Sequence, residues 1–130
     1  MNLEYLSDIN LYQPEDALIR LYDFDSKQAK LFQELIEHRI LQNQQEVDLT
    51  TIDFIQSVNC KLKMKMGNID QGIQRINEKE FYCQLTKDSY RRMLDLVQPF
   101  VDDTGGFQWL YDLDYETTKI EFLFSPGGGW

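Results

Sequence analysis

One stretch in the middle of the chain alternates apolar and polar side chains without a break. Over residues 58–66 the apolar positions are Val58, Cys60, Leu62, Met64 and Met66, and the polar positions between them are Asn59, Lys61, Lys63 and Lys65. Successive side chains of a β-strand point to opposite faces, so this period of two predicts a strand with one buried face. The rest of the chain must therefore supply partner strands and an apolar layer to cover that face.

Other segments carry weaker strand patterns of the same kind. Residues 17–24 are dense in β-formers, and residues 81–85 alternate through Phe81, Cys83 and Leu85. Residues 107–113 and 118–124 alternate as well, which predicts a hairpin with its tip at about residues 114–117.

The first of two main helices is predicted over residues 25–42. Asp25 can cap its start, with Gln28 three residues later as the partner of a capping box. The apolar positions that recur at helical spacing are Ala29, Leu31, Phe32, Leu35, Ile36 and Ile40. His38, the one histidine, falls on the wet side four residues after Glu34, so we expect an exposed helix pair rather than a catalytic base.

The second main helix is predicted over residues 86–98. Thr86 can cap its start, and Pro99 disfavours helical backbone at the residue before it, which predicts an end near residue 98. Its apolar stripe consists of Tyr90, Met93, Leu94, Val97 and Val101. The residues from Gly67 to about 80, with Gly72 among them, are predicted as one long loop.

Together these elements predict an α+β fold. We expect a single domain over residues 1–130, with a mostly antiparallel sheet and two main helices on one face. The order of elements resembles a ferredoxin-like βαββαβ unit with an added C-terminal strand. Residues 1–16 are expected to form an irregular N-terminal arm or a short helix, and residues 125–130 a flexible C-terminal tail.

Composition narrows the classes of function. The chain has 22 acids, 13 bases and a formal net charge of −9, which argues against nucleic acids and anionic membrane surfaces as partners. No apolar run approaches the roughly 20 residues of a membrane span, and the first residues lack the pattern of a secretory signal. Cys60 and Cys83 lack metal-motif spacing, so we expect reduced core thiols in a cytoplasmic protein. No cofactor or phosphate-loop motif occurs, and none is predicted.

Charge is uneven along the chain. Twelve of the 22 acids lie in residues 1–25 and 102–121, where the only bases are Arg20 and Lys119. By contrast, the predicted strand at 58–66 carries a basic stripe, Lys61, Lys63 and Lys65. This stripe is expected to keep the exposed face wet and to discourage edge pairing, with an acidic partner or a phosphate as the alternative.

The acidic hairpin and its aromatic residues form the candidate partner-binding site. Its residues are Trp109, Tyr111, Asp112, Asp114, Tyr115 and Glu116. Alternate acids from Asp112 onward resemble the start of a calcium loop, but Thr117 and Leu123 stand where that loop needs Gly and Glu. Trp and Tyr are common anchors of protein interfaces, so an acidic hairpin tip with aromatic anchors is the better interpretation.

These features favour a non-catalytic protein-binding module with a basic partner. In size, acidity and aromatic content the chain resembles small bacterial immunity or inhibitor proteins, which implies a basic toxin or nuclease as the partner. The alternatives are a small-molecule-binding module, a homodimeric structural module, or an enzyme that uses Asp112 or Asp114 as a carboxylate catalyst.

Overall fold

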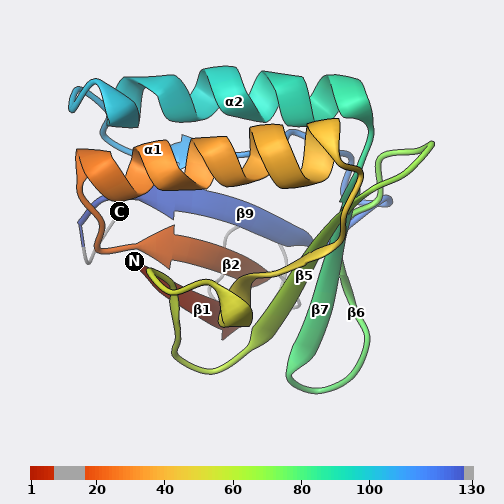
Figure 1. Cartoon of the computed structure of the whole chain (residues 1–130). Helices are drawn as coiled ribbons and strands as arrows, with labels where there is room; N and C mark the ends of the chain where they lie inside the picture. Colours follow the sequence, from red (N-terminus) through yellow and green to blue (C-terminus); the bar gives the residue numbers. More distant parts are fainter. Residues whose placement is uncertain (8–16, 128–130) are drawn as a thin grey trace.

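Two helices lie side by side over one face of a β-sheet, and a second sheet stands at a steep angle to the first (Figure 1). The computed structural model describes residues 1–7 and 17–127. The expected α+β class with two main helices is confirmed.

The first sheet, which lies beneath the helices, has the strand order β4-β1-β2-β9-β8. Its strands are β1 (Asn2–Ser7), β2 (Ala17–Tyr22), β4 (Gln56–Ser57), β8 (Gln108–Trp109) and β9 (Ile120–Ser125). Strands β1 and β2 pair antiparallel, whereas β2 and β9 pair parallel along their whole length, from Ala17 opposite Ile120 to Tyr22 opposite Ser125.

The second sheet has the order β3-β5-β7-β6. Its strands are β3 (Val47–Asp48), β5 (Lys61–Met66), β6 (Gly72–Arg75) and β7 (Glu80–Leu85). Strand β7 lies between β5, to which it is parallel, and β6, to which it is antiparallel. The predicted alternation is confirmed over Lys61–Met66, where Leu62 and Met64 are buried while Lys61 is exposed, but the strand does not begin at residue 58, and Val58, expected on the buried face, is 50% exposed.

The expected single, mostly antiparallel sheet with ferredoxin-like order is therefore corrected to two mixed sheets. The physical reason lies in residues 67–80, which contain β6 and are not one long loop. Strand β6 follows β5 in the chain but pairs on the far side of β7. The chain therefore reverses direction twice, and β7 lies beside β5 in the same direction. A plain loop would have made those two strands an antiparallel hairpin.

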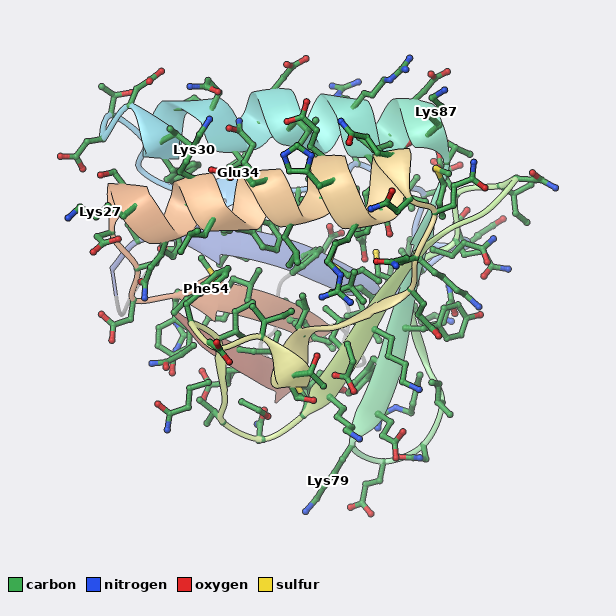
Figure 2. All side chains as sticks on the ribbon, viewed as in Figure 1. Lys27, Lys30, Glu34, Phe54, Lys79 and Lys87 are labelled. Atoms are coloured by element: carbon green, nitrogen blue, oxygen red, sulfur yellow. The ribbon has the colours of Figure 1, made fainter. Side chains whose placement is uncertain are left out.

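The first predicted helix is present over nearly its expected length. It consists of α1 (Ser26–Leu35) and the π-helical turns η1 (Ile36–Gln42), and Asp25 caps it by accepting a hydrogen bond from the Gln28 backbone N at 2.8 Å. A short 3-10 helix, η2 (Leu49–Thr51), follows β3. Leu31, which was expected on the buried face, is 46% exposed. Its neighbours Lys27 and Lys30 project outward from α1 (Figure 2).

The second helix, α2 (Lys87–Val101), runs through Pro99 and does not end at residue 98. Pro99 lies in the last turn, where the loss of one N–H interrupts little of the helix ladder. Its own carbonyl oxygen is satisfied by the backbone N and the hydroxyl of Thr104, at 2.9 and 3.0 Å. The steric preference against helix before proline thus gave way to one extra turn that buries Phe100.

Residues 1–16 also depart from expectation. Residues 2–7 form β1, which lies between β4 and β2 in the first sheet, and not part of an irregular arm or short helix. The remainder of the expected arm and the end of the expected tail lie outside the described residues. On the C-terminal side, β9 continues to Ser125, one residue into the expected tail.

The core lies between the helices and the first sheet and continues into the second sheet. Aromatic rings concentrate under the helices, where Phe24, Phe32 and Phe100 each lie within 5.4 Å, centroid to centroid, of the Phe124 ring. Other fully buried side chains include Leu3, Leu18, Ile19, Leu21, Ile36, Ile40, Leu49, Phe81, Tyr90 and Phe122.

The two sheets are joined by side-chain hydrogen bonds at a seam formed by Ile73, Tyr111, Thr118 and Ile120. Thr118 Oγ1 donates to the Ile73 carbonyl oxygen at 2.6 Å. The Tyr111 hydroxyl accepts from the Ile73 backbone N at 3.1 Å and donates to the Ile120 carbonyl oxygen. The backbone polar groups of Ile73 that face away from β7 are satisfied in this way.

The lysine stripe does not lie on an edge strand, contrary to the interpretation made from the sequence. Strand β5 is paired on both sides, with β3 and with β7. Two of its lysines have contacts within the protein: Lys61 Nζ lies 3.9 Å from Asp48 Oδ2, and Lys65 Nζ lies 4.5 Å from the centroid of the Tyr82 ring. Lys79, in contrast, projects into solvent from the turn between β6 and β7 (Figure 2).

Candidate functional site

A groove of about 400 Å³ opens between α2 and the chain that leads from β8 to β9. Helix α2, strand β8, the loop after it and strand β9 all contribute side chains. The lining residues are Arg92, Leu96, Gln108, Trp109, Tyr111, Asp112 and Glu121. Three of the six predicted site residues, Trp109, Tyr111 and Asp112, are therefore brought together here.

Backbone pairing with β9 places the aromatic wall of the groove. Gln108 pairs with Phe124 and Trp109 with Leu123, and the Leu110 backbone N donates to the Phe122 carbonyl oxygen at 2.8 Å. The predicted hairpin is confirmed in this antiparallel pairing, but its first strand is only two residues long. After Leu110 the chain leaves the ladder, and Asp112 becomes exposed.

Tyr111 lines the groove, but its hydroxyl is engaged within the protein. The hydroxyl is buried in the seam, where it bonds Ile73 and Ile120. Burial raises the pKa of Tyr111 well above the ordinary value for tyrosine. The side chain therefore stays protonated at neutral pH and keeps its role as a donor to Ile120, which makes it a structural residue first.

The aromatic edge of the groove extends outward through Phe107. The Phe107 and Trp109 ring centroids are 6.5 Å apart with the rings at 82°, an edge-to-face contact. Phe107 is 54% exposed and Trp109 is half-buried. An exposed phenylalanine beside a half-buried tryptophan leaves apolar surface that a partner could cover.

Three charged side chains line the groove, one cation and two carboxylates. Arg92 and Asp112 are exposed, and neither side chain has a hydrogen bond or ion pair with any other described residue. Glu121 is half-buried and already interacts with another group of the protein. The groove itself thus carries a net charge of −1 when all three are ionised.

The other predicted site residues lie in the neighbouring turn. Asp114, Tyr115 and Glu116 are exposed at the hairpin tip, which is closed by hydrogen bonds from the Thr117 and Thr118 backbone N to the Asp114 carbonyl oxygen at 2.9 and 3.1 Å. They do not line the groove. The structure thus divides the predicted site into a groove and an adjacent acidic turn.

Sequence reasoning missed the helical side of the groove. Arg92 and Leu96 are four residues apart and share one face of α2, next to the predicted core stripe. That spacing was visible in the sequence, but the packing of this face beside β8 depends on tertiary contacts. Gln108 and Glu121 complete the lining and were also not among the predicted site residues.

The reactive residue types lie elsewhere in the fold. Cys60 and Cys83 are buried as expected. Burial, with a smaller contribution from the Glu4 charge, raises the pKa of Cys60 to about 12, and burial likewise raises the pKa of Cys83. His38 is exposed as expected, but its partner is Gln42 and not Glu34, with His38 Nδ1 3.2 Å from Gln42 Oε1.

Within residues 1–7 and 17–127, no three His, Cys, Asp or Glu side chains gather in a way that could hold a metal ion. Within the same residues, neither main helix has the length and apolar character needed to cross a bilayer.

Comparison with known proteins assigns neither the groove nor the acidic turn to a family. The chain matches no protein-family model and no curated protein.

Proposed function

We propose that this protein is a non-catalytic binding module, and that its groove and the acidic turn beside it engage a protein more basic than itself. The observation that carries the proposal is the joining of Trp109 and Asp112 in one groove, with further exposed acids next to it. The lining combines charged and apolar side chains, a combination suited to binding a partner.

The charge of this region supports a basic partner. The two acid-rich segments, 1–25 and 102–121, meet in the first sheet, where Ala17 lies opposite Ile120 and Leu18 lies opposite Glu121. Both bases in these segments have contacts close by. Arg20 Nη2 lies 2.7 Å from Glu4 Oε1, and Lys119 Nζ lies 5.3 Å from the Tyr115 ring centroid.

The exposed acids therefore give the turn a negative potential that its local bases reduce only in part. Such a field accelerates encounter with a basic partner, while aromatic groups slow dissociation once the contact is made. A basic toxin or nuclease fits this description, in a cytoplasmic setting.

The proposal is tested by isolating a partner and then measuring how fast it associates. Affinity capture from the native host supplies the candidate, and its association rate is measured at two salt concentrations. Replacement of three acids together, Asp112→Asn, Asp114→Asn and Glu116→Gln, should slow association roughly three- to thirtyfold and flatten the salt dependence.

A matched variant separates the position of the charge from its amount. Glu46→Gln, Asp53→Asn and Glu78→Gln together remove the same three charges from exposed positions elsewhere in the chain. We expect this control to change association much less than the first triple variant. A partner whose association rate is indifferent to salt and to both variants would contradict the acidic surface proposed here.

A homodimeric module is the second class of partner. The exposed side chains Phe107, Ile69 and Ile76 are the kind of apolar surface that a second copy could cover. Sedimentation of the purified protein over a wide concentration range decides this point. A strict monomer at high concentration would leave the basic partner as the proposal, whereas a dimer that buries Trp109 would replace it.

A further inference from the structure

The groove has the size of a site for one side chain or a small ligand. Its volume of about 400 Å³ falls near the lower end of the roughly 300 to 1,000 Å³ that small-ligand pockets occupy. A folded segment of a partner would not fit inside it, but one long side chain would. The question is therefore which side chain its lining suits.

Trp109 and Asp112 together favour a planar cation. The indole ring of Trp109 is the best aromatic partner for a cation, and a guanidinium can stack on it with its plane parallel to the ring. The Asp112 carboxylate has no hydrogen bond or ion pair with any described residue, so it can accept two parallel hydrogen bonds from the guanidinium. An ammonium group can do neither the stacking nor the paired hydrogen bonding as well.

Arg92 has the opposite effect. It lies on the α2 side of the groove and carries a like charge, so it opposes a bound cation and favours an anion. Asp112 offsets this charge, and the exposed carboxylates of the neighbouring turn, Asp114 and Glu116, add to the field of Asp112. The net balance favours a cation, and Arg92 becomes the residue whose removal distinguishes the two signs of ligand.

We propose that the groove receives an arginine side chain of a basic partner, with the guanidinium stacked on Trp109 and paired with Asp112. This inference rests on the proposed function, because it names the group of the partner that the same site recognises. It goes further in assigning the contact to two residues and in giving Arg92 a defined effect on affinity.

The test uses a blocked amino acid as the probe. N-acetyl-arginine methylamide is titrated into protein carrying Trp130→Phe, so that Trp109 is the only indole, and the indole N–H signal of Trp109 is followed by NMR. We expect a saturable shift with a dissociation constant of the order of millimolar, because one stacked ion pair supplies only a few kcal/mol. N-acetyl-lysine methylamide should bind more weakly by about threefold or more, and N-acetyl-glutamate methylamide should leave the signal unchanged.

Two exposed substitutions give the sign of the charge effect. Asp112→Asn should weaken the arginine probe about three- to tenfold, and Arg92→Gln should strengthen it about two- to threefold by removing a like charge. If the glutamate probe shifts Trp109 and Arg92→Gln abolishes that shift, the groove binds anions and the proposal is overturned. It is overturned as well if none of the three probes moves the Trp109 signal.

The two levels of inference fail separately. If a basic partner associates in a manner that depends on the acidic turn but the arginine probe does not bind, the proposed function stands and the arginine assignment fails. If the probe binds and no basic partner can be isolated, the groove assignment stands and the proposed function fails.

Discussion

Gly72 has a φ of +65° and lies at the start of β6, close to the seam. A Cβ at this position would lie 2.8 Å from Thr118 Cγ2 and 2.9 Å from Leu113 Cδ1. Left-handed backbone is strained for residues with a side chain, and the surrounding atoms belong to a packed region. Two separate constraints thus require glycine here.

Gly72→Ala should therefore destabilise the protein by about 2 to 4 kcal/mol, from backbone strain together with overpacking. The free energy of unfolding is measured by urea denaturation. Gly106→Ala is the control, since a Cβ there would meet nothing within 4 Å, and its effect should stay within about 0.5 kcal/mol. Equal effects of the two substitutions would show that the seam does not pack as tightly as described.

Single residues were predictable where burial alone decides their role. The exposure of His38 and the burial of Cys60 and Cys83 followed from their positions in periodic patterns. The role of Tyr111 was not predictable. An alternation with a period of two shows which face of a strand a ring occupies, but not which distant backbone group its hydroxyl will meet. Ile73 is 38 residues away in the chain, so no local rule links the two.

At the scale of elements, the start of α2 shows how a distant loop completes a local cap. Thr86 Oγ1 accepts a hydrogen bond from the Ser89 backbone N at 3.3 Å, as its sequence position predicts. Asp70, from the loop before β6, adds two stronger bonds. Its Oδ1 accepts from the Thr86 backbone N at 2.7 Å, and its Oδ2 accepts from Ser89 Oγ at 2.9 Å.

These bonds make the contribution of Asp70 depend on pH. Burial tends to raise the pKa of this carboxyl, but the hydrogen bonds from Thr86 and Ser89 outweigh it and lower the pKa below 3.8. A lowered pKa in the folded state means that the carboxylate stabilises the fold at neutral pH. That stability is lost as the pH falls through the folded-state pKa.

Asp70→Asn should lower the free energy of unfolding by about 1 kcal/mol at neutral pH, the usual cost of a weakened helix cap. The difference between variant and wild type should narrow as the pH falls through the lowered folded-state pKa, because the wild-type carboxylate then becomes protonated. Asp88→Asn serves as the control, because Asp88 is exposed in the first turn of α2 and should contribute only a few tenths of a kcal/mol. A difference that stayed constant with pH would show that the charge on Asp70 is not involved.

The elements themselves were largely predictable, and their errors have identifiable causes. Both main helices and strands β2, β5 and β7 followed from periodicity and caps. Strands β1, β4 and β6 were missed, because β4 and β6 are only two and four residues long and the alternation of β1 breaks at Leu6. The end of α2 was missed because burial of Phe100 outweighed the local effect of Pro99.

At the scale of the whole molecule, the partition into two sheets was not predictable from the chain. Which strands pair depends on contacts across long separations, and β2 meets β9 only after more than 90 residues have intervened. The candidate site shows the same limit. Its aromatic and acidic side came from the sequence, whereas its α2 side required the packed structure.

The seam is one of the places where hydrogen bonds join the two sheets, and Arg75 of β6, which donates to the Tyr5 hydroxyl of β1 at 2.7 Å, is another. The Tyr111 and Thr118 hydroxyls bond opposite sides of the same residue, the backbone N and the carbonyl oxygen of Ile73. Both hydroxyls also reach Ile120. Since they share both backbone partners, loss of one hydroxyl should loosen the geometry that the other needs.

We therefore expect Tyr111→Phe and Thr118→Val to be coupled in a double-mutant cycle. Each single substitution should cost about 1 to 3 kcal/mol, because each leaves a buried backbone group without its partner. The double variant should cost less than the sum by at least about 0.5 kcal/mol, measured by urea denaturation. Tyr111→Phe combined with Thr51→Val is the control, since Thr51 Oγ1 bonds the Asp48 carbonyl oxygen and shares no partner with Tyr111. Strict additivity in both cycles would show that the two hydroxyls act independently and that the seam is not a coupled unit.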